Sequence, residues 1–353
     1  MGINTGNILF VGPFSPPYNG DGIKNSYLRE GFEEAGLTKV QWFDTIARSG
    51  PRWKNNLRLI LSMMHANQVV FSLNCNGRYY ILPIFWFLSL FTNKKGVLFV
   101  IGGSFDVQLS KYLPLWRRKV FVKILNKLDG IFAESSTLKQ GLEDVGLKNV
   151  VKVYNPRKDD GSRWKLKNAI RTKGVFISRV TASKGILVLL KAIEQINNTE
   201  EKLSLDIYGP MDENYKDEVF RYIDSSNGAI SYKGIVKPDR VQLLLTEYHF
   251  LVLPTFHSGE GLPGILVEAG MAGIPIIITR FNALGEYFKE DKSALFVEPE
   301  NVADLRKAFR RLISDDQLAE TLSEGIKKEV VPFRLESVIH QTLQLLNNYN
   351  WKV

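Results

Sequence analysis

The feature that most constrains the fold of this 353-residue chain is an alternation between β-rich apolar runs and amphipathic helical patterns. In the first half, the runs that predict strands fall at 7–12, 39–43, 68–72, 96–101, 130–133 and 150–154. The series begins again in the second half, at 174–178, 203–209, 229–234, 249–254, 274–278 and 294–298. Strands that alternate with helices form parallel sheets, because each crossover helix returns the chain to the end of the sheet where the previous strand began. The next strand therefore runs in the same direction. The pattern therefore predicts two doubly wound α/β domains.

A polar, charged segment with Pro and Gly, YNPRKDDGSRWKLKN at 154–168, lies between the two series and reads as a linker. A chain of this length is also long for a single hydrophobic core. We expect Rossmann-like domains at 1–160 and 161–332, followed by a C-terminal helix within 333–353 that packs back on the first domain. Ligands of such folds bind at the carboxyl ends of the strands, so the cleft between facing domains is the expected site.

Composition narrows the class of protein. The chain is 44% hydrophobic and 24% charged, as in a globular protein, and its single Cys75 fits a reducing compartment. No secretory signal opens the chain, so a cytoplasmic location is expected. The most apolar window, ILPIFWFLSLF at 81–91, is well short of the ~20 residues that a spanning helix needs. We interpret it as a buried helix between strands and expect no integral membrane segment.

Positive charge is concentrated in the first half. Residues 1–170 hold 24 Lys and Arg against 12 Asp and Glu, whereas residues 171–353 hold 22 against 25. The basic segments are 47–60 and 111–128, and the second interleaves Arg117, Arg118, Lys119 and Lys123 with Trp116, Phe121 and Ile124. A basic amphipathic helix with aromatic residues is typical of an anionic membrane surface, although an ordinary packed helix with a solvated basic face is the plainer alternative. No nucleic-acid reader motif appears, so nucleic acid is not expected as a partner.

The run EGLPGILVE at 260–268 sets two acids around a Gly-Pro-Gly turn, directly after the strand predicted at 249–254. A helix is expected to begin near Ile265, and the free amides and positive dipole at its start form an anion site. Glu268 would lie one turn inside the helix, on the same face as Gly264. The competing interpretation is a capping carboxylate followed by an exposed helix acid, and spacing alone does not separate the two.

Two further segments suggest phosphate binding. Arg179 follows a predicted strand and Lys184 precedes the next helix, an arrangement that suits a pyrophosphate unless both are solvated loop cations. In the first domain, Gly20 and Gly22 follow the first strand, in a loop that fits neither G-x-G-x-x-G nor a P-loop. The four histidines are scattered without ligand spacing, so no metal site is expected, and only His257 lies near Glu260.

Taken in order, these segments resemble the retaining glycosyltransferases of family 4, which have the two-Rossmann B-type fold. The residues that carry the resemblance are GPFSPPYNGDG (12–22), YNP (154–156), FISRVTASKGILVLLKA (176–192), LDIYGP (205–210), YKGIV (232–236) and LPTFHSGEGLPGILVEAGMAGIPIIIT (253–279). The last contains the Glu-x7-Glu motif of that family in a Gly-Leu-Pro variant. The resemblance implies a B-type glycosyltransferase that needs no metal or other cofactor.

The resemblance also implies residue roles. Glu260 would contact the donor hexose at the reaction centre, and Glu268 would bind the ribose of a nucleotide sugar. Arg179 and Lys184 would neutralise the leaving diphosphate, together with the amides of Leu262, Gly264 and Ile265. Gly20 or Gly22 would close on the phosphates, and the backbone from Gly234 to Val236 would border the base.

One departure from the family concerns its cleft histidine. Where many relatives carry a histidine after a first-domain strand, this chain reads VIGGSFD at 100–106. The contact that the family's histidine makes with the sugar is therefore missing or is supplied by Ser104, Asp106 or His257. This difference concerns the identity of the donor more than the class of reaction.

The resulting hypothesis is an enzyme that moves a sugar from a UDP- or GDP-linked donor to a lipid-linked saccharide acceptor in polysaccharide or glycolipid biosynthesis. Its first domain would rest on the inner face of the cytoplasmic membrane. Two alternatives remain: a nucleotide-sugar epimerase of the same fold and a non-catalytic nucleotide-sugar-binding module. Turnover of the donor distinguishes the transferase from these two alternatives.

Overall fold

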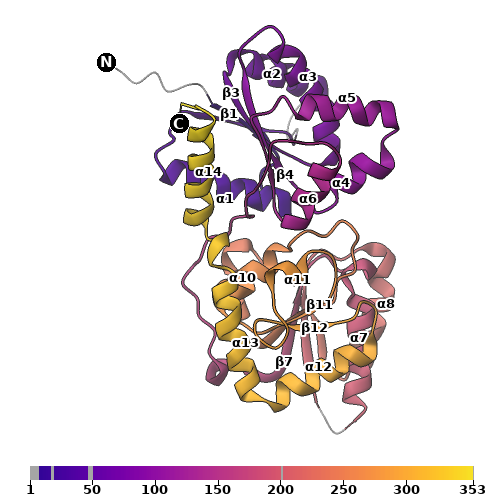
Figure 1. The fold of residues 1–353 in the computed structure, drawn as a ribbon. Coiled ribbons are helices and arrows are strands. Elements are labelled where there is room, and N and C mark those ends of the chain that lie inside the picture. The colour runs from indigo at the N-terminus through magenta and orange to yellow at the C-terminus, as the bar shows by residue number, and fades with distance from the viewer. Residues whose placement is uncertain (1–7, 17–19, 47–50, 200–201, 353) are drawn as a thin grey trace. The chain divides into compact units, whose positions relative to one another are not determined.

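The structure is a computed structural model that describes residues 8–16, 20–46, 51–199 and 202–352. The chain divides into two compact units, which are described separately (Figure 1). The first comprises Met1–Lys158 and Phe333–Val353, and the second comprises Asp159–Pro332. Each unit is built on a six-stranded parallel sheet with helices packed against it. The predicted fold class, two Rossmann-like parallel-sheet domains, is confirmed.

In the first unit the strands are ordered β2-β1-β3-β4-β5-β6. They are β1 (Ile8–Gly12), β2 (Val40–Asp44), β3 (Gln68–Leu73), β4 (Lys95–Val100), β5 (Gly130–Ala133) and β6 (Val150–Lys152). Strands β1, β3, β4 and β5 are buried almost throughout, which is why their sequences are continuous apolar runs rather than alternating ones. The order reverses between β1 and β3, so this unit has its topological switch point there.

Two helix layers cover this sheet. One face packs against α1 (Gly20–Glu34) and α14 (Leu335–Asn348), through residues such as Phe32 and Val338. The other packs against α2 (Arg52–His65), α3 (Cys75–Ser89), α5 (Leu115–Leu125) and α6 (Ser136–Asp144). Between β4 and α5 lie the short helix α4 (Phe105–Val107) and one π-helical turn, η1 (Gln108–Tyr112).

The interpretation of residues 81–91 as a buried helix is wrong in part. Residues 81–89 do form the second half of α3, and Leu82 and Phe85 are buried in the core. Phe87, Leu90 and Phe91 are instead exposed, the last by 74%. Apolar residues occupy both sides of this helix, and a sheet can cover only one of them. No helix among the described residues has the length and apolarity needed to cross a membrane.

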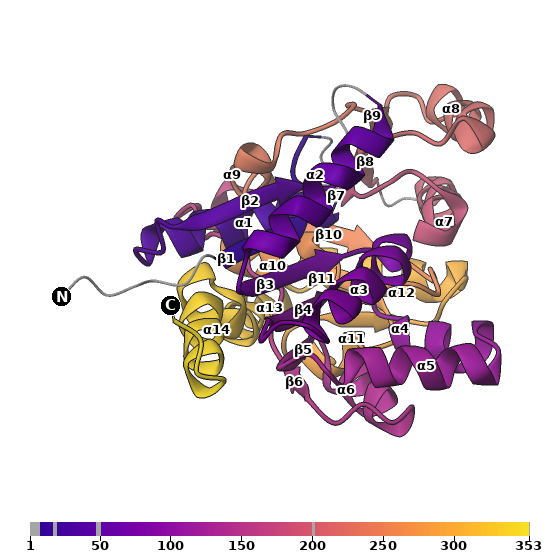
Figure 2. The same ribbon diagram turned by 90° about the horizontal axis from the view of Figure 1, so that it is seen from above.

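Helix α14 packs against α1 in the first unit, and Figure 2 shows it, in yellow, against that unit. Close approach depends on Gly31 of α1, where a Cβ atom would overlap the side chains of Ile339 and Leu335 of α14. We expect Gly31→Ala to lower the free energy of unfolding by about 2 kcal/mol, because overpacking forces the two helices apart. Urea denaturation measures the change. Gly285→Ala is the control, since a Cβ there meets nothing within 4 Å; an equal loss in both variants would contradict the packing argument.

In the second unit the strands are ordered β12-β11-β10-β7-β8-β9. They are β7 (Ile170–Ile177), β8 (Ser204–Tyr208), β9 (Ile230–Tyr232), β10 (Tyr248–Leu253), β11 (Ile276–Thr279) and β12 (Leu295–Val297). Counted from the first strand of this unit, the order is the 3-2-1-4-5-6 arrangement of dinucleotide-binding folds, with the switch point between β7 and β10. The helices are α7 (Ile186–Asn197), α8 (Lys216–Ser225), α9 (Val241–Leu245), α10 (Gly264–Ala272), α11 (Leu284–Tyr287), α12 (Val302–Ser314) and α13 (Asp316–Glu329).

His249 makes the stability of the second unit depend on pH. It lies fully buried in β10, and neither ring nitrogen has a hydrogen-bond partner among the described residues. Burial lowers the pKa of His249, and the positive charge of Arg171 lowers it further. In the unfolded chain the imidazole of His249 therefore binds a proton as the pH falls through about 6.5, whereas in the folded chain it stays neutral to a lower pH. Stability is unaffected above that pH and is lost as the pH falls below it.

We expect the free energy of unfolding to fall by up to about 1.4 kcal/mol per pH unit below pH ~6.5 because of this residue. Urea titrations between pH 5 and pH 8 measure the slope. His249→Leu should flatten the slope, whereas His65→Gln, at an exposed position on α2, should not. A slope that His249→Leu leaves unchanged would show that other groups cause it.

Candidate active site

The candidate site lies at the carboxyl ends of β7 and β10, the two parallel neighbours that flank the switch point of the second unit. At such a point the loops after the two strands run to opposite sides of the sheet and leave a crevice for a ligand. The loop after β7 carries Arg179 and Lys184, and the loop after β10 carries His257 and Glu260. The topology thus brings together two segments about 75 residues apart in the chain.

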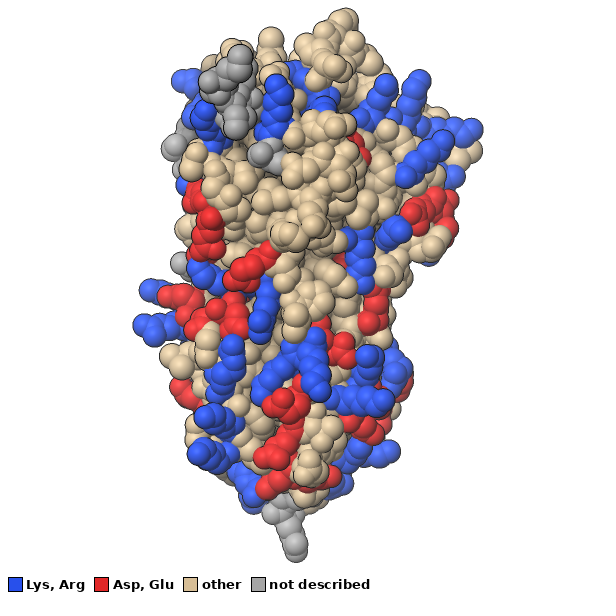
Figure 3. All heavy atoms as spheres, turned by 60° about the vertical axis from the view of Figure 1, so that its left-hand side comes forward, with Lys and Arg blue, Asp and Glu red and all other residues tan. Residues whose placement is uncertain are grey.

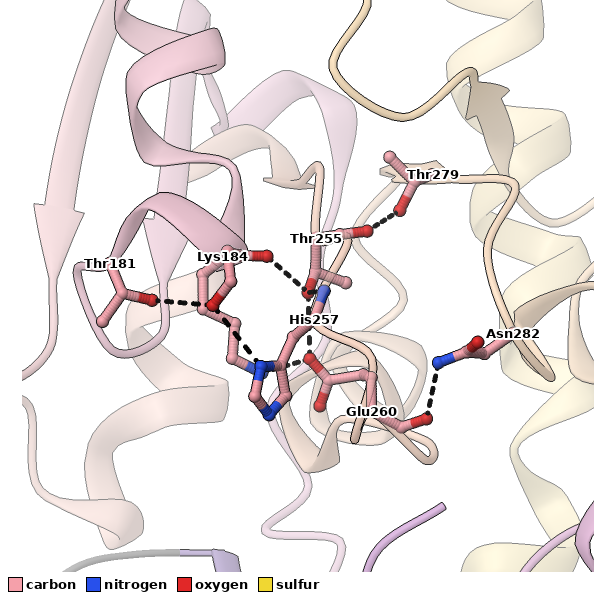
Figure 4. Close-up of polar contacts among 8 residues, drawn as sticks. Thr181, Lys184, Thr255, His257, Glu260, Thr279 and Asn282 are labelled. Atoms are coloured by element: carbon pink, nitrogen blue, oxygen red, sulfur yellow. Dashed lines mark hydrogen bonds and ion pairs between the residues drawn. The ribbon is translucent and has the colours of Figure 1, made fainter. Parts of the chain in front are cut away.

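Lys184 and Glu260 form an ion pair across these loops (Figure 4). Their side chains are only 8% and 12% exposed. A pair that is this well shielded is screened little by salt, and removal of one partner leaves an uncompensated charge in a poorly hydrated position. Both residues were singled out from the sequence, but their direct contact was not expected, because Lys184 was assigned to the diphosphate and Glu260 to the sugar.

Thr255 orients the Glu260 carboxylate. Its hydroxyl donates to Glu260 Oε2 over 3.0 Å. The backbone oxygen of Thr255 accepts from the hydroxyl of Thr279, which lies at the end of β11. Asn282 adds a second support, since its side-chain amide donates to the backbone oxygen of Glu260 over 3.1 Å. Sequence reasoning missed these three residues, although Thr255 lies two residues after the end of β10 and a polar residue near a strand end was a usable signal.

His257 lies beside the ion pair. Its Nδ1 is 3.4 Å from the hydroxyl oxygen of Ser183, and its backbone N–H donates to the Thr255 hydroxyl. Burial lowers the pKa of His257, and the positive charges of Lys184 and Arg179 oppose its protonation further, while Glu260 acts in the other direction. The ring is therefore neutral at pH 7 and can donate one hydrogen bond and accept another.

Gly185 fixes the distance between the two loops. It adopts a φ of +82°, in the left-handed region, and is the N-cap of α7. A Cβ atom here would overlap the backbone oxygen of Pro254 and lie 2.7 Å from its carbonyl carbon. The amide of Phe256 donates to the backbone oxygen of Ser183 over 2.9 Å and ties the same loops together. Only glycine combines this backbone conformation with so close an approach.

Helix α10 starts just after this loop, at Gly264, one residue before the expected start at Ile265. Its N-cap is Pro263, which has no side-chain cap, so the first-turn amides at Gly264 and Ile265 remain available at the positive end of the helix. Leu262 is buried and anchors the turn. Glu268 lies one turn into α10 and is only 7% exposed, so the interpretation of an exposed helix acid does not hold.

The other predicted residues of this unit lie near strand ends. Arg179 is exposed and follows β7. Gly209, at the end of β8, packs against the backbone next to Arg179. Gly234 accepts a hydrogen bond from the amide of Gly209 and has a φ of +76°, and Val236 follows it in the loop after β9. Among the described residues, no three His, Cys, Asp or Glu side chains are grouped as a metal site would require.

The remaining predicted residues belong to the first unit. Gly20 and Gly22 lie in the first turn of α1, while residues 17–19 of the preceding loop lie outside the described residues. Ser104 precedes α4 and Asp106 lies within it, at the carboxyl end of β4. Sequence reasoning missed the buried charges at the same sheet edge. Lys24 of α1 pairs with Glu134 over 2.7 Å, and Arg78 of α3 donates to Gln108 over 3.1 Å.

The basic residues that were predicted to face a membrane lie on α5. Arg117, Lys119 and Lys123 are exposed, and Arg118 is half-buried. The expectation that Phe121 and Ile124 share this surface is wrong, because both are buried in the core against the sheet. Trp116 alone of the three apolar residues is exposed, by 65%. Residues 47–50 of the other basic segment, including Arg48, lie outside the described residues.

Part of the chain is similar in sequence to known glycosyltransferases. The family model "Glycosyl transferases group 1" matches residues 158–329. An uncharacterized glycosyltransferase of Methanocaldococcus jannaschii, MJ1178, is 26% identical over 167 residues, which cover 47% of this chain and 45% of that protein. A putative colanic acid biosynthesis glycosyltransferase of Escherichia coli, WcaL, is 25% identical over 183 residues, which cover 49% of this chain and 44% of that protein. The match thus spans about half the length of these curated relatives.

Among solved structures, HepE of Anabaena in complex with UDP and glucose superposes with a TM-score of 0.74 at 13% identity. The superposition covers 97% of this chain and 99% of HepE, and at that identity it establishes the fold. The superposition thus shows the two-domain fold, and residues 158–329 are similar to group 1 glycosyl transferases.

Proposed function

We propose that the protein is a retaining glycosyltransferase that moves a sugar from a nucleotide-diphosphate sugar to a saccharide acceptor. The observation that carries the proposal is the shielded Lys184–Glu260 pair at the switch point, directly before the uncapped start of α10. The neighbouring fold of HepE, solved with UDP and glucose, supports a UDP-linked donor, and a GDP-linked donor is the other candidate. Membership of family 4 and the role of residues 260–268 as its Glu-x7-Glu motif belong to the same proposal.

The main catalytic task in this reaction is to stabilise the leaving diphosphate. The bond between the anomeric carbon and the phosphate oxygen breaks, and negative charge grows on that oxygen. Lys184 has three N–H donors, so it can hold Glu260 and still donate to a phosphate oxygen. Arg179 and the amides of Gly264 and Ile265 supply further fixed positive potential.

Retention follows if the acceptor hydroxyl attacks from the face that the diphosphate leaves. The new bond joins the acceptor oxygen to the anomeric carbon, and the acceptor proton passes to the departing phosphate oxygen. This route needs no protein nucleophile. Its rate depends instead on how the donor and the acceptor hydroxyl are positioned. Glu260, held by Lys184 and Thr255, would orient hydroxyls of the transferred sugar, while Glu268 would bind the ribose.

The first unit would supply the remaining contacts. Gly20 and Gly22 at the start of α1 would approach the donor phosphates, and Ser104 or Asp106, or else His257, would replace the cleft histidine of the family. The acceptor is proposed to be lipid-linked, at the cytoplasmic face of a membrane, in polysaccharide or glycolipid biosynthesis. The similarity to the colanic acid glycosyltransferase WcaL supports the polysaccharide context.

A thermal-shift panel of UDP-, GDP- and ADP-sugars tests the donor assignment. We expect one nucleotide series to raise the melting temperature, because a ligand that binds only the folded state stabilises it. Glu268→Gln should abolish that shift, since the ribose would lose a charge-assisted hydrogen bond. Glu320→Gln, at an exposed position on α13, is the matched control and should keep it. No shift with any nucleotide sugar would contradict the proposal.

Product analysis separates the proposed function from the two alternatives. A transferase releases free nucleoside diphosphate in proportion to glycosylated acceptor. An epimerase yields an isomer of the donor without free diphosphate, and a binding module leaves the donor unchanged.

A further inference from the structure

Large apolar side chains are exposed mainly on one layer of the first unit. Among the described residues, 17 large apolar side chains are exposed, and 12 of them lie between Trp53 and Val120. That stretch includes α2, α3 and α5, which pack side by side, α3 between the other two, on the same face of the sheet. We call the outward-facing side of these three helices the α2–α3–α5 surface. A concentration of this kind on one helix layer marks an interaction site.

Helix α2 has two apolar sides. Leu59 and Met63 are buried against the sheet. Trp53, Leu57, Leu61 and Met64 are exposed, and their spacing of four, four and three residues puts them on one side of the helix. A helix that only covers a sheet needs the first set alone. The second set is a continuous apolar stripe that no described residue of the fold buries.

Helices α3 and α5 extend this stripe. On α3 and directly after it, Tyr80, Phe87, Leu90 and Phe91 are exposed. Before and on α5, Tyr112, Leu115, Trp116 and Val120 are exposed as well. The aromatic residues among them have the amphipathic character found where proteins meet the interfacial region of a bilayer.

The same stretch is nearly free of acids. Residues 45–128 contain thirteen Lys and Arg but only one acid, Asp106. Arg52, Lys54 and Arg58 are exposed on α2, and the exposed basic residues of α5 stand beside its apolar ones. Figure 3 shows Lys and Arg with few acidic neighbours in the uppermost part of the view, whereas both charges are interspersed lower down.

We propose that the α2–α3–α5 surface inserts its apolar side chains into the interfacial region of an anionic phospholipid bilayer. Anionic headgroups complement the basic residues, and the acyl-chain boundary accommodates the apolar stripe. A second copy of this chain fits less well, because a symmetric pair would bring two basic surfaces together. The inference is independent of sugar transfer, since vesicle binding is measured without any donor.

Insertion differs from electrostatic docking in its response to salt. Contacts between exposed charges are screened at high ionic strength, whereas burial of apolar surface is not weakened by screening. We therefore expect the full chain to float with vesicles of phosphatidylglycerol and phosphatidylcholine, and part of that binding to persist at 1 M salt. Loss of all binding at high salt would overturn insertion.

Three sets of substitutions test the assignment by flotation. Trp53→Ser, Leu57→Ser, Phe87→Ser and Phe91→Ser together should lower the partition coefficient by about tenfold or more and remove the salt-resistant part. Arg117→Gln, Arg118→Gln and Lys119→Gln should remove the preference for anionic over neutral vesicles. Phe220→Ser with Leu243→Ser, exposed positions of the second unit, should change neither. Equal loss in this control set would overturn the assignment to the first unit.

A second measurement reports on the inserted side chains directly. Fluorescence of Trp53 and Trp116 should shift to the blue on vesicle addition and be quenched by brominated lipid, and Trp53→Phe with Trp116→Phe should remove both effects. Gel filtration tests the competing occupant. A dimer that the four apolar substitutions convert into a monomer, without vesicle binding by the original chain, would show that the surface is a protein interface and overturn the proposal.

Discussion

Replacement of Glu260 by Gln is expected to lower kcat for sugar transfer by about 10²–10³-fold while donor affinity is largely kept. Glutamine keeps the size of the side chain and can still accept from Lys184 and Thr255, so the loop should stay in place. What is lost is the negative charge beside the reacting sugar. Steady-state kinetics with the donor found by thermal shift, together with donor titration, separate the effect on kcat from the effect on binding.

Glu268→Gln is the matched comparison, because it changes the other acid of the same run. It should weaken donor binding and raise KM, whereas Glu260→Gln should act mainly on kcat. If both substitutions acted on KM alone, Glu260 would be a donor-binding residue and the assignment of the reaction centre would be wrong.

Gly185→Ala is expected to lower the free energy of unfolding by about 3 kcal/mol or more and to reduce turnover at least tenfold. The alanine would pay for a left-handed conformation and would also collide with the backbone oxygen of Pro254. The collision separates the loop that carries Lys184 from the loop that carries Glu260. A displacement of about 1 Å in such a site is enough to cost up to ~10²-fold in rate.

Gly228→Ala isolates the steric part of that effect. Gly228 has the same φ of +82°, but a Cβ there meets nothing within 4 Å. Its substitution should cost only about 1–2 kcal/mol and leave turnover unchanged. Urea denaturation and steady-state kinetics on both variants make the comparison, and equal losses in the two would contradict the role of Gly185 as a spacer between the loops.

The fold was largely predictable because buried parallel strands are continuous apolar runs. All twelve strands fall at the expected positions, and α10 starts within one residue of its prediction. Strand order was harder, because the sequence does not say which strands become neighbours. The adjacency of β7 and β10, which creates the candidate site, is visible only in the sheet.

The candidate site was predictable as a set of residues but not as a set of contacts. Glu260 and Lys184 stood out by type and position, whereas their ion pair depends on how closely Gly185 lets two loops approach. Thr255 was missed because a threonine after a strand is common in loops of every kind.

The apolar surface of the first unit shows a further limit of sequence patterns. Apolar residues on two sides of α3 give no indication of which side faces the sheet, so the whole run 81–91 reads as core. Burial separates Phe85 from Phe87, and that separation exists only once the helix is packed.

Lys184, which is paired with Glu260 in the loop before α10, is proposed to bind the diphosphate of the donor. Calorimetric titration of UDP and UMP, and of GDP and GMP, into the original chain and Lys184→Met tests it most directly. A Lys184→Met/Glu260→Gln double variant controls for the unpaired acid. We expect the diphosphate of the accepted base to bind more tightly than its monophosphate, and both variants to reduce this preference by about tenfold or more. A preference that survives the loss of Lys184 unchanged would contradict it.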